Sequence, residues 1–189
     1  MIASTPLQLA PGAKELAQQA QQAGANVLSC YQCRKCTAGC PVAGRADLKP
    51  HELVRMVQLG QRDAVLACKA IWECTSCQTC ITRCPQKVDI AALNDLLRQM
   101  SREAGTVAAG TAVPAFNDIF LGTVRRFGRM YEMGLMVAFK LRTRRFLADV
   151  AKFPMMLWKR KLSILPSPGR GSAQRKRLFE RTKFGGASR

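Results

Sequence analysis

Apolar residues recur at helical spacing between residues 41 and 73. A helix is predicted to begin at Pro50, because proline fits the first helical turn, and to end near Gly60. The apolar residues on one face of this helix are Leu53, Val54, Met56 and Val57. A second short helix is expected from about Arg62. The alternation of β-branched residues between turn glycines that hairpins require is missing here, so the pattern favours helices over strands.

Helical patterns also flank this segment. Residues 14–22 are good helix formers and end before Gly24, a residue typical of helix ends. Farther along, Asp89 is expected to cap a helix that ends near Gly105. The apolar stripe of this helix consists of Ile90, Leu93, Leu96, Leu97 and Met100. A longer helical region is expected from Pro114, and the glycines that interrupt it are Gly122, Gly128 and Gly134.

The sequence does not predict a membrane-spanning helix. The longest apolar stretch after residue 114, residues 133–139, has seven residues, far short of the roughly 20 that a crossing needs. Residues 141–158 instead alternate apolar and basic side chains, with Pro154 as a kink. A helix with this basic amphipathic pattern would lie on a membrane surface or in the groove of a partner protein.

Eight of the nine cysteines repeat one pattern. The two runs are Cys30, Cys33, Cys36 and Cys40, followed by Pro41, and Cys74, Cys77, Cys80 and Cys84, followed by Pro85. A cubane [4Fe–4S] cluster needs four thiolates that converge on one small body. Three cysteines spaced by two residues lie in one tight loop around three of its iron atoms. The sequence therefore predicts two [4Fe–4S] clusters.

The fourth cysteine of each run is expected to bind the cluster of the other run, as it does in two-cluster ferredoxins with this spacing. The first cluster would then be held by Cys30, Cys33, Cys36 and Cys84, and the second by Cys74, Cys77, Cys80 and Cys40. Because helical segments join the cysteine runs, the expected fold class is all-α: an α-helical ferredoxin domain with a C-terminal helical extension.

Two other uses of cysteine fit the pattern less well. A structural zinc site takes four ligands, commonly as two CxxC pairs, and does not call for three evenly spaced cysteines with a fourth beyond them. Disulfides form in oxidising compartments, whereas residues 1–10 lack the basic start and apolar core of a signal peptide. We therefore expect a cytoplasmic protein with metal-bound cysteines.

Three further residues favour structural over chemical roles. Cys68 completes no ligand set and is expected to be a small buried apolar side chain, with a redox-active thiol or a substitute ligand as the alternative. Trp72 is expected in the core rather than as a shield of the cluster. His51, the only histidine, is expected at the surface or as a helix cap. With so little material for acid–base chemistry, no catalytic residue is expected.

The chain is strongly basic, with a formal charge of +18. Residues 125–189 contain 18 Lys and Arg against three acidic residues, so +15 of this charge lies in the last third. Because a two-cluster module passes electrons to docked partners, docking to a protein is the first interpretation and contact with a membrane surface the second. Nucleic acid is not expected, since the basic residues form no reading motif. The basic residues near the cysteines, Arg34, Lys35, Arg83 and Lys87, either favour the reduced clusters or form a solvated docking face.

These patterns divide the chain into four parts. They are an N-terminal extension with a short helix (1–26), a dicluster α-helical ferredoxin domain (27–105), a helical extension for partner docking (106–166) and a basic tail (167–189). The tail is rich in glycine, serine and basic residues, and it is expected to be flexible unless a partner orders it.

Three stretches of sequence carry a resemblance to a known family. They are CYQCRKCTAGCP (30–41), WECTSCQTCITRCP (72–85) and GRMYEMG (128–134). With the residues around them, which cover most of positions 14–166, they resemble the C subunit of heterodisulfide reductase. The cysteine runs alone are shared with the iron–sulfur subunits of succinate dehydrogenase and glycolate oxidase.

The resemblance implies an electron relay within an oxidoreductase complex. The family's C subunit takes electrons from a flavin-containing A subunit and passes them to a B subunit with CCG motifs, and no CCG motif occurs in this chain. It also implies that all eight cysteines of the two runs are ligands and that the substrate site belongs to a partner. Two alternatives stay open: the iron–sulfur subunit of another flavoprotein dehydrogenase, which would bring it to a membrane through its partners, and a free basic ferredoxin.

Overall fold

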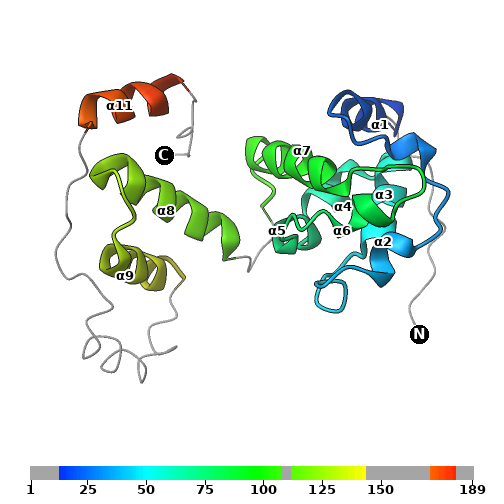
Figure 1. The fold of residues 1–189 in the computed structure, drawn as a ribbon, viewed down its shortest axis with the longest axis horizontal. Coiled ribbons are helices and arrows are strands. Elements are labelled where there is room, and N and C mark those ends of the chain that lie inside the picture. The colour runs from blue at the N-terminus through cyan, green and yellow to red at the C-terminus, as the bar shows by residue number, and fades with distance from the viewer. Residues whose placement is uncertain (1–12, 108–111, 144–170, 182–189) are drawn as a thin grey trace. The chain divides into compact units, whose positions relative to one another are not determined.

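The computed structural model describes residues 13–107, 112–143 and 171–181, which form helices and no strand. The chain divides into two compact units, Met1–Thr111 and Ala112–Arg189, and both are drawn in Figure 1. The predicted all-α fold class is confirmed for the described residues.

Short helices build the first unit, with loops that carry the cysteines between them. In chain order they are α1 (Ala13–Gln22), the 3-10 helix η1 (Val27–Ser29), α2 (Lys35–Ala38), α3 (Pro50–Gln58), α4 (Arg62–Leu66), α5 (Ala70–Glu73), α6 (Thr79–Arg83) and α7 (Ile90–Glu103). Cluster-binding loops that alternate with helices are what the hydrophobic pattern predicted.

Local sequence signals set several helix ends. After α1 and α3 the chain turns at Gly24 and Gly60, whose φ angles of 81° and 72° suit glycine. Pro50 is the first residue of α3, as predicted. At the start of α7, the Asp89 carboxylate accepts a hydrogen bond from the Ala92 N–H at 2.9 Å. This contact satisfies one of the backbone donors that a helix N-terminus leaves free, and it confirms the predicted cap.

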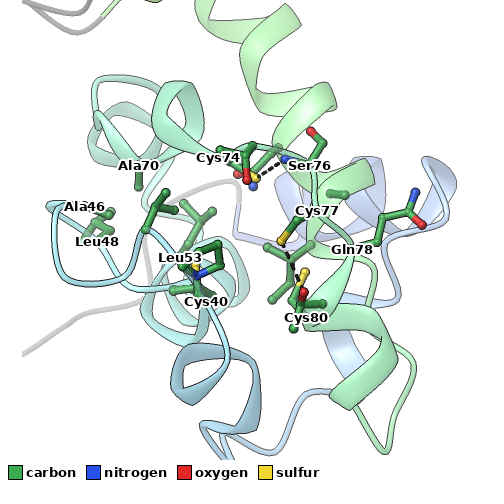
Figure 2. Close-up of a pocket in the computed structure, with 18 residues that line it drawn as sticks. Cys40, Ala46, Leu48, Leu53, Ala70, Cys74, Ser76, Cys77, Gln78 and Cys80 are labelled. Atoms are coloured by element: carbon green, nitrogen blue, oxygen red, sulfur yellow. Dashed lines mark hydrogen bonds between the residues drawn. The ribbon is translucent and has the colours of Figure 1, made fainter.

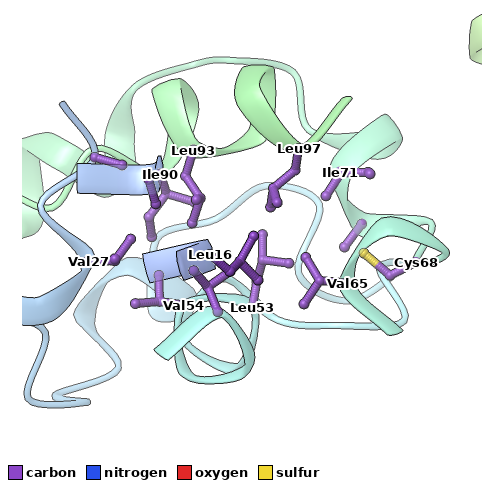
Figure 3. Close-up of a cluster of buried hydrophobic side chains, with 14 of the residues drawn as sticks. Leu16, Val27, Leu53, Val54, Val65, Cys68, Ile71, Ile90, Leu93 and Leu97 are labelled. Atoms are coloured by element: carbon purple, nitrogen blue, oxygen red, sulfur yellow. The ribbon is translucent and has the colours of Figure 1, made fainter. Parts of the chain in front are cut away.

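A hydrophobic core lies between α1, α3 and α7. Ile90, Leu93 and Leu97 point from α7 into this core, toward the side chains of α1 and α3 (Figure 3). Cys68 and Trp72 belong to the same core, with 5% and 4% of their surface exposed, which confirms the expectation that they are packing residues. Burial raises the pKa of the Cys68 thiol.

The second unit contains α8 (Val113–Phe127), α9 (Glu132–Thr143) and α11 (Ser172–Arg181). The rings of Phe116 in α8 and Phe139 in α9 make an edge-to-face contact with centroids 5.9 Å apart. Of the three glycines expected to interrupt this region, Gly128 does so, because it adopts a left-handed conformation with φ of 81° at the end of α8. The other two, Gly122 and Gly134, lie inside helices.

The structure differs from the expected flexible tail in one segment. Helix α11 forms within the basic residues 167–189. Its Arg175 side chain donates hydrogen bonds to the carbonyls of Arg125 at 3.0 Å and Arg126 at 3.4 Å. Those carbonyls lie in the last turn of α8, where backbone acceptors lack helical partners and attract a cation, which gives this basic segment a partner within its own unit.

None of the described helices combines the length and the apolar character that a membrane crossing needs. The basic amphipathic pattern of residues 141–158 falls outside the described residues from position 144 onward.

Replacing Asp89 with Ala should lower the free energy of unfolding by about 1 kcal/mol, because the Ala92 N–H loses its acceptor. Asp89→Asn should keep most of the stability, since asparagine caps helices about as well. Anaerobic urea unfolding followed by circular dichroism measures both. Equal stability of Asp89→Ala and the unmodified chain would contradict the assigned cap.

Candidate metal centre

The two groups of closely spaced cysteines lie in loops of the same backbone shape. We call residues 30–36 the first loop and residues 74–80 the second loop. Left-handed residues occur at matching places in both: Gln32 and Ser76 precede the second cysteine, with φ of 63° and 51°, and Arg34 and Gln78 follow it, with φ of 63° and 60°. Such conformations are costly for residues other than glycine and persist where surrounding structure requires them. Both loops are therefore shaped for the same task.

Backbone amides in and near the loops donate hydrogen bonds to cysteine sulfur. The Ser76 N–H lies 3.4 Å from Cys74 Sγ, and the Val88 N–H lies 3.3 Å from Cys84 Sγ. Alternation of right- and left-handed residues turns N–H groups to one side of a loop and makes a hollow that binds anions. The loops are thus suited to thiolates and to a negatively charged cluster.

The ends of the two cysteine runs, at Cys40 and Cys84, lie close together. Each loop leads into a short helix, α2 or α6, which ends just before Cys40 or Cys84. Gly39 and Arg83 occupy the same place in the two runs, and they touch: a Cβ on Gly39 would lie 2.7 Å from Arg83 Cδ. Because α2 packs against α6 in this way, each fourth cysteine starts near the boundary between the two loops.

A cavity lies beside the second loop and is lined in part by its residues (Figure 2). Its cysteines are Cys74, Cys77 and Cys80 of the second run together with Cys40 of the first. The rest of its wall is mostly apolar and includes Val42, Leu48, Leu53 and Ile90. The fold thus brings the fourth cysteine of one run to the loop of the other.

Cys84 lies close to the first loop. Partial desolvation raises the pKa of the Tyr31 hydroxyl, followed by the charge of Cys33, a hydrogen bond with Cys33, and the charges of Cys84 and Cys30. The Tyr31 side chain, between Cys30 and Cys33, is therefore within electrostatic range of Cys84, the fourth cysteine of the other run. This is the counterpart of the placement of Cys40 beside the second loop.

The thiols differ in how readily they give up their protons. Burial is the main cause that raises the pKa of Cys36 and Cys80, the third cysteines of the two loops. The Thr79 hydroxyl, 3.4 Å from Cys77 Sγ, lowers the pKa of that exposed thiol. Because iron binds thiolates, cluster assembly must remove protons from these half-buried thiols, which couples metal binding to pH.

The donors at the second loop's cavity suit an iron–sulfur cluster, since the sulfur donors there are four cysteine thiols. Within the described residues, no group of three or more His, Cys, Asp or Glu side chains is placed to hold a single ion. A zinc ion would draw its sulfur ligands to about 2.3 Å. A cubane instead spreads its ligands over separate iron corners, so its four cysteines lie farther apart than those of a zinc site.

A polar side chain from the helix after each run holds the start of its loop. Gln58 of α3 donates from Nε2 to the carbonyls of Val27 and Cys30, at 2.9 and 3.1 Å. Arg98 of α7 donates to the corresponding carbonyls in the second run, which are Ile71 at 2.5 Å and Cys74 at 2.6 Å. In both runs the accepting carbonyls belong to the first cysteine and to the residue three positions before it. The two halves of the unit are therefore a structural repeat.

Further hydrogen bonds join the segment after one run to the segment before the other. Asp47, after the first run, accepts from the N–H groups of Lys69 and Ala70 at 2.7 and 2.8 Å, at the start of α5. Asn26, before the first run, donates to the Gln86 carbonyl at 3.1 Å, after the second run. The two halves are thus interlocked by contacts between residues far apart in sequence.

The expected place of His51 was wrong. It is buried, with 9% of its surface exposed, and its Nδ1 lies 2.7 Å from the Thr37 hydroxyl, next to Cys36. Burial lowers the pKa of His51, so the ring is neutral near pH 7. The sequence alone does not show whether a histidine on a helix face lies at the surface or in the core. His51 is buried because α2 packs against α3. Sequence reasoning also missed Gln58 and Arg98, because a single polar residue in a helix gives no spacing signal.

Comparison with known proteins supports the cluster assignment. Residues 29–89 match the family model of a 4Fe-4S dicluster domain. The chain therefore binds two [4Fe–4S] clusters, as predicted from the cysteine runs. The match covers both runs and the helices between them.

The chain is also similar to subunits of heterodisulfide reductases. It is 35% identical over 128 residues to the C2 subunit of the H2/formate:CoB-CoM heterodisulfide,ferredoxin reductase of Methanococcus maripaludis, which covers 61% of this chain and 63% of the relative. It is 37% identical over 106 residues to the C2 iron-sulfur subunit of the CoB–CoM heterodisulfide reductase of Methanocaldococcus jannaschii, covering 50% and 56%. The chain spans less than two thirds of the length of these relatives, and the resemblance inferred from sequence is confirmed.

Replacing Arg98 with Leu should destabilise the second loop by about 1.5–3 kcal/mol, the range for hydrogen bonds to charged groups. Gln58→Leu should cost less, about 1 kcal/mol, because its amide is neutral. Anaerobic denaturation of the cluster-loaded protein, followed by visible absorbance and circular dichroism, measures both. Gln99→Leu on the exposed face of α7 is the control. If all three variants behave alike, the two side chains do not hold the loops.

Proposed function

We propose that this chain, whose residues 29–89 match a 4Fe-4S dicluster domain, is the iron–sulfur electron-transfer subunit of a heterodisulfide-reductase-like complex. It would relay single electrons from a flavin-containing A subunit to a CCG-motif B subunit. The observation that carries this proposal is the convergence of Cys40 with Cys74, Cys77 and Cys80 around one cavity. A pair of loops interlocked in this way serves two clusters held close together, as an electron relay needs.

Each run would supply three ligands to its own cluster and one to the other. The first cluster would be held by Cys30, Cys33, Cys36 and Cys84, and the second by Cys74, Cys77, Cys80 and Cys40. The position of Cys40 in the second loop's cavity and of Cys84 near Tyr31 supports both sets. The bound clusters would accept and release one electron each.

The protein's own groups would hold the clusters and set their surroundings. Cysteine thiolates bind iron, and the N–H groups of Ser76 and Val88 donate to sulfur. Gln58 and Arg98 keep each loop in place by holding its backbone carbonyls. A fixed geometry keeps the reorganisation on electron transfer small, which suits a relay without a substrate site of its own.

One surface beside the first loop is suited to a partner. Leu28 and Tyr31 each expose 59% of their surface, and Cys33, two residues after Tyr31, is also exposed. Arg34 and Lys35 follow it and are exposed as well. Exposed apolar side chains with basic neighbours favour an acidic protein that docks close to the first cluster.

The crossed ligand sets predict which pairs of substitutions act together. Cys40→Ala and Cys77→Ala should damage the same cluster, so the double variant should keep the other cluster and about four of the eight irons expected for two cubanes. Cys40→Ala with Cys33→Ala should damage both clusters. Anaerobic iron and sulfide analysis, with electron paramagnetic resonance of the reduced protein, distinguishes the two pairs. The opposite pattern would show that each run holds its own cluster.

The docking surface predicts a partner-specific loss of electron transfer. Tyr31→Glu should slow reduction of the clusters by a copurified flavoprotein several-fold while iron content stays unchanged, and added salt should slow the unmodified protein too. Val107→Glu, at another exposed apolar residue of the first unit, is the control. A stable monomer that binds neither a flavoprotein nor a CCG-motif protein and reduces many acceptors equally would favour a free ferredoxin instead.

A further inference from the structure

Asn94 is a buried polar residue that the ligand sets leave unexplained. It lies on α7 with 3% of its surface exposed, and its side-chain oxygen has no hydrogen-bond partner. A buried amide without a partner destabilises a protein. Its place in the second loop's cavity wall, beside Cys40 and Cys74, suggests that the missing partner occupies that cavity.

The expected occupant of the cavity is a [4Fe–4S] cluster, which can only accept a hydrogen bond. The sulfides and thiolates of a [4Fe–4S] cluster accept hydrogen bonds and donate none. The oxygen and nitrogen of an asparagine amide are nearly the same size, so a half-turn of the group exchanges them. The amide of Asn94 can therefore present an N–H to sulfur.

The other side chains that have a buried oxygen or nitrogen without a partner do not offer this contact. Among the described residues they are Gln19, Trp72 and Glu73, and none of them lines the cavity. Glu73 directly precedes Cys74, but it does not line the cavity. Asn94 is thus the described buried side chain that combines an unpartnered amide oxygen with a place in the cavity wall.

The structural repeat shows that this amide belongs to one half of the unit. Gln58 of α3 and Arg98 of α7 hold equivalent carbonyls, so they occupy equivalent helix positions. One turn earlier, four residues before each, stand Val54 and Asn94. Val54 is fully buried and apolar. At this matched position, the helix that holds the first loop therefore carries an apolar side chain, and the helix that holds the second loop carries an amide.

We propose that Asn94 donates a hydrogen bond to a sulfur atom of the cluster held by the second loop and raises the reduction potential of that cluster. The reduced cluster carries one more negative charge, so a donor stabilises it more than the oxidised form. The inference rests on the proposed function, because it uses the second loop's ligand set. The charges of Arg98, Asp95 and Glu73 stay the same in Asn94 variants, so the effect of the amide can be measured separately.

The test is an anaerobic redox titration of the cluster-loaded protein followed by electron paramagnetic resonance. Asn94→Leu, which has a similar shape but no donor, should shift one cluster to a lower potential and leave the other unchanged. Asn94→Ser, which keeps a hydroxyl donor, should shift it less. Val54→Leu, the matched substitution in α3, should move neither potential. Unchanged potentials in an Asn94→Leu protein that carries both clusters would overturn the inference.

A second measurement needs no variant. With 15N in the side-chain amides of asparagine, pulsed electron paramagnetic resonance of the reduced protein should show a 15N coupling at one cluster. No such coupling at either cluster would also overturn the inference. An unmodified protein that lacks two [4Fe–4S] clusters would instead remove the proposed function, so the two failures are distinguishable.

Discussion

The first unit depends on one constraint: its two halves, each with one cysteine run, are interlocked by contacts between residues far apart in sequence. Asp47 joins the segment after the first run to the start of α5, and Asn26 joins the segment before the first run to residues after the second. Between these contacts, Gly39 packs on Arg83 and brings the ends of both runs together. Without this interlocking, each loop would keep three thiolates and the fourth would have no fixed place.

This constraint links metal binding to folding. The core between α3 and α7 holds the helices that carry Gln58 and Arg98, and these side chains hold the loops. A bound cluster would in turn tie the two halves through Cys40 and Cys84. Because thiols such as Cys36 and Cys80 have raised pKa values, iron must compete with protons for them, and cluster binding would stabilise the fold at the same time.

The repeat also contains differences that matter for function. The first loop has exposed apolar and basic neighbours, including Tyr31 and Arg34, whereas the second loop borders a mostly apolar cavity with a buried amide, Asn94. Potentials of [4Fe–4S] clusters respond to exposure, charge and hydrogen bonds to sulfur. Two clusters that are each held by four cysteines can therefore differ in potential.

The sequence by itself determined the longer helices of the first unit, the all-α class and the two clusters, because these depend on local spacing: a helical period, the cap at Asp89, and cysteines within one loop. Tertiary structure decided that Cys40 lies beside the second loop, that His51 is buried against Thr37, and that Arg98 and Gln58 hold equivalent carbonyls. The side of a helix that meets another element depends on the path of the whole backbone. A single polar residue such as Asn94 reads the same in the sequence whether it faces water or a cavity, and only packing distinguishes the two.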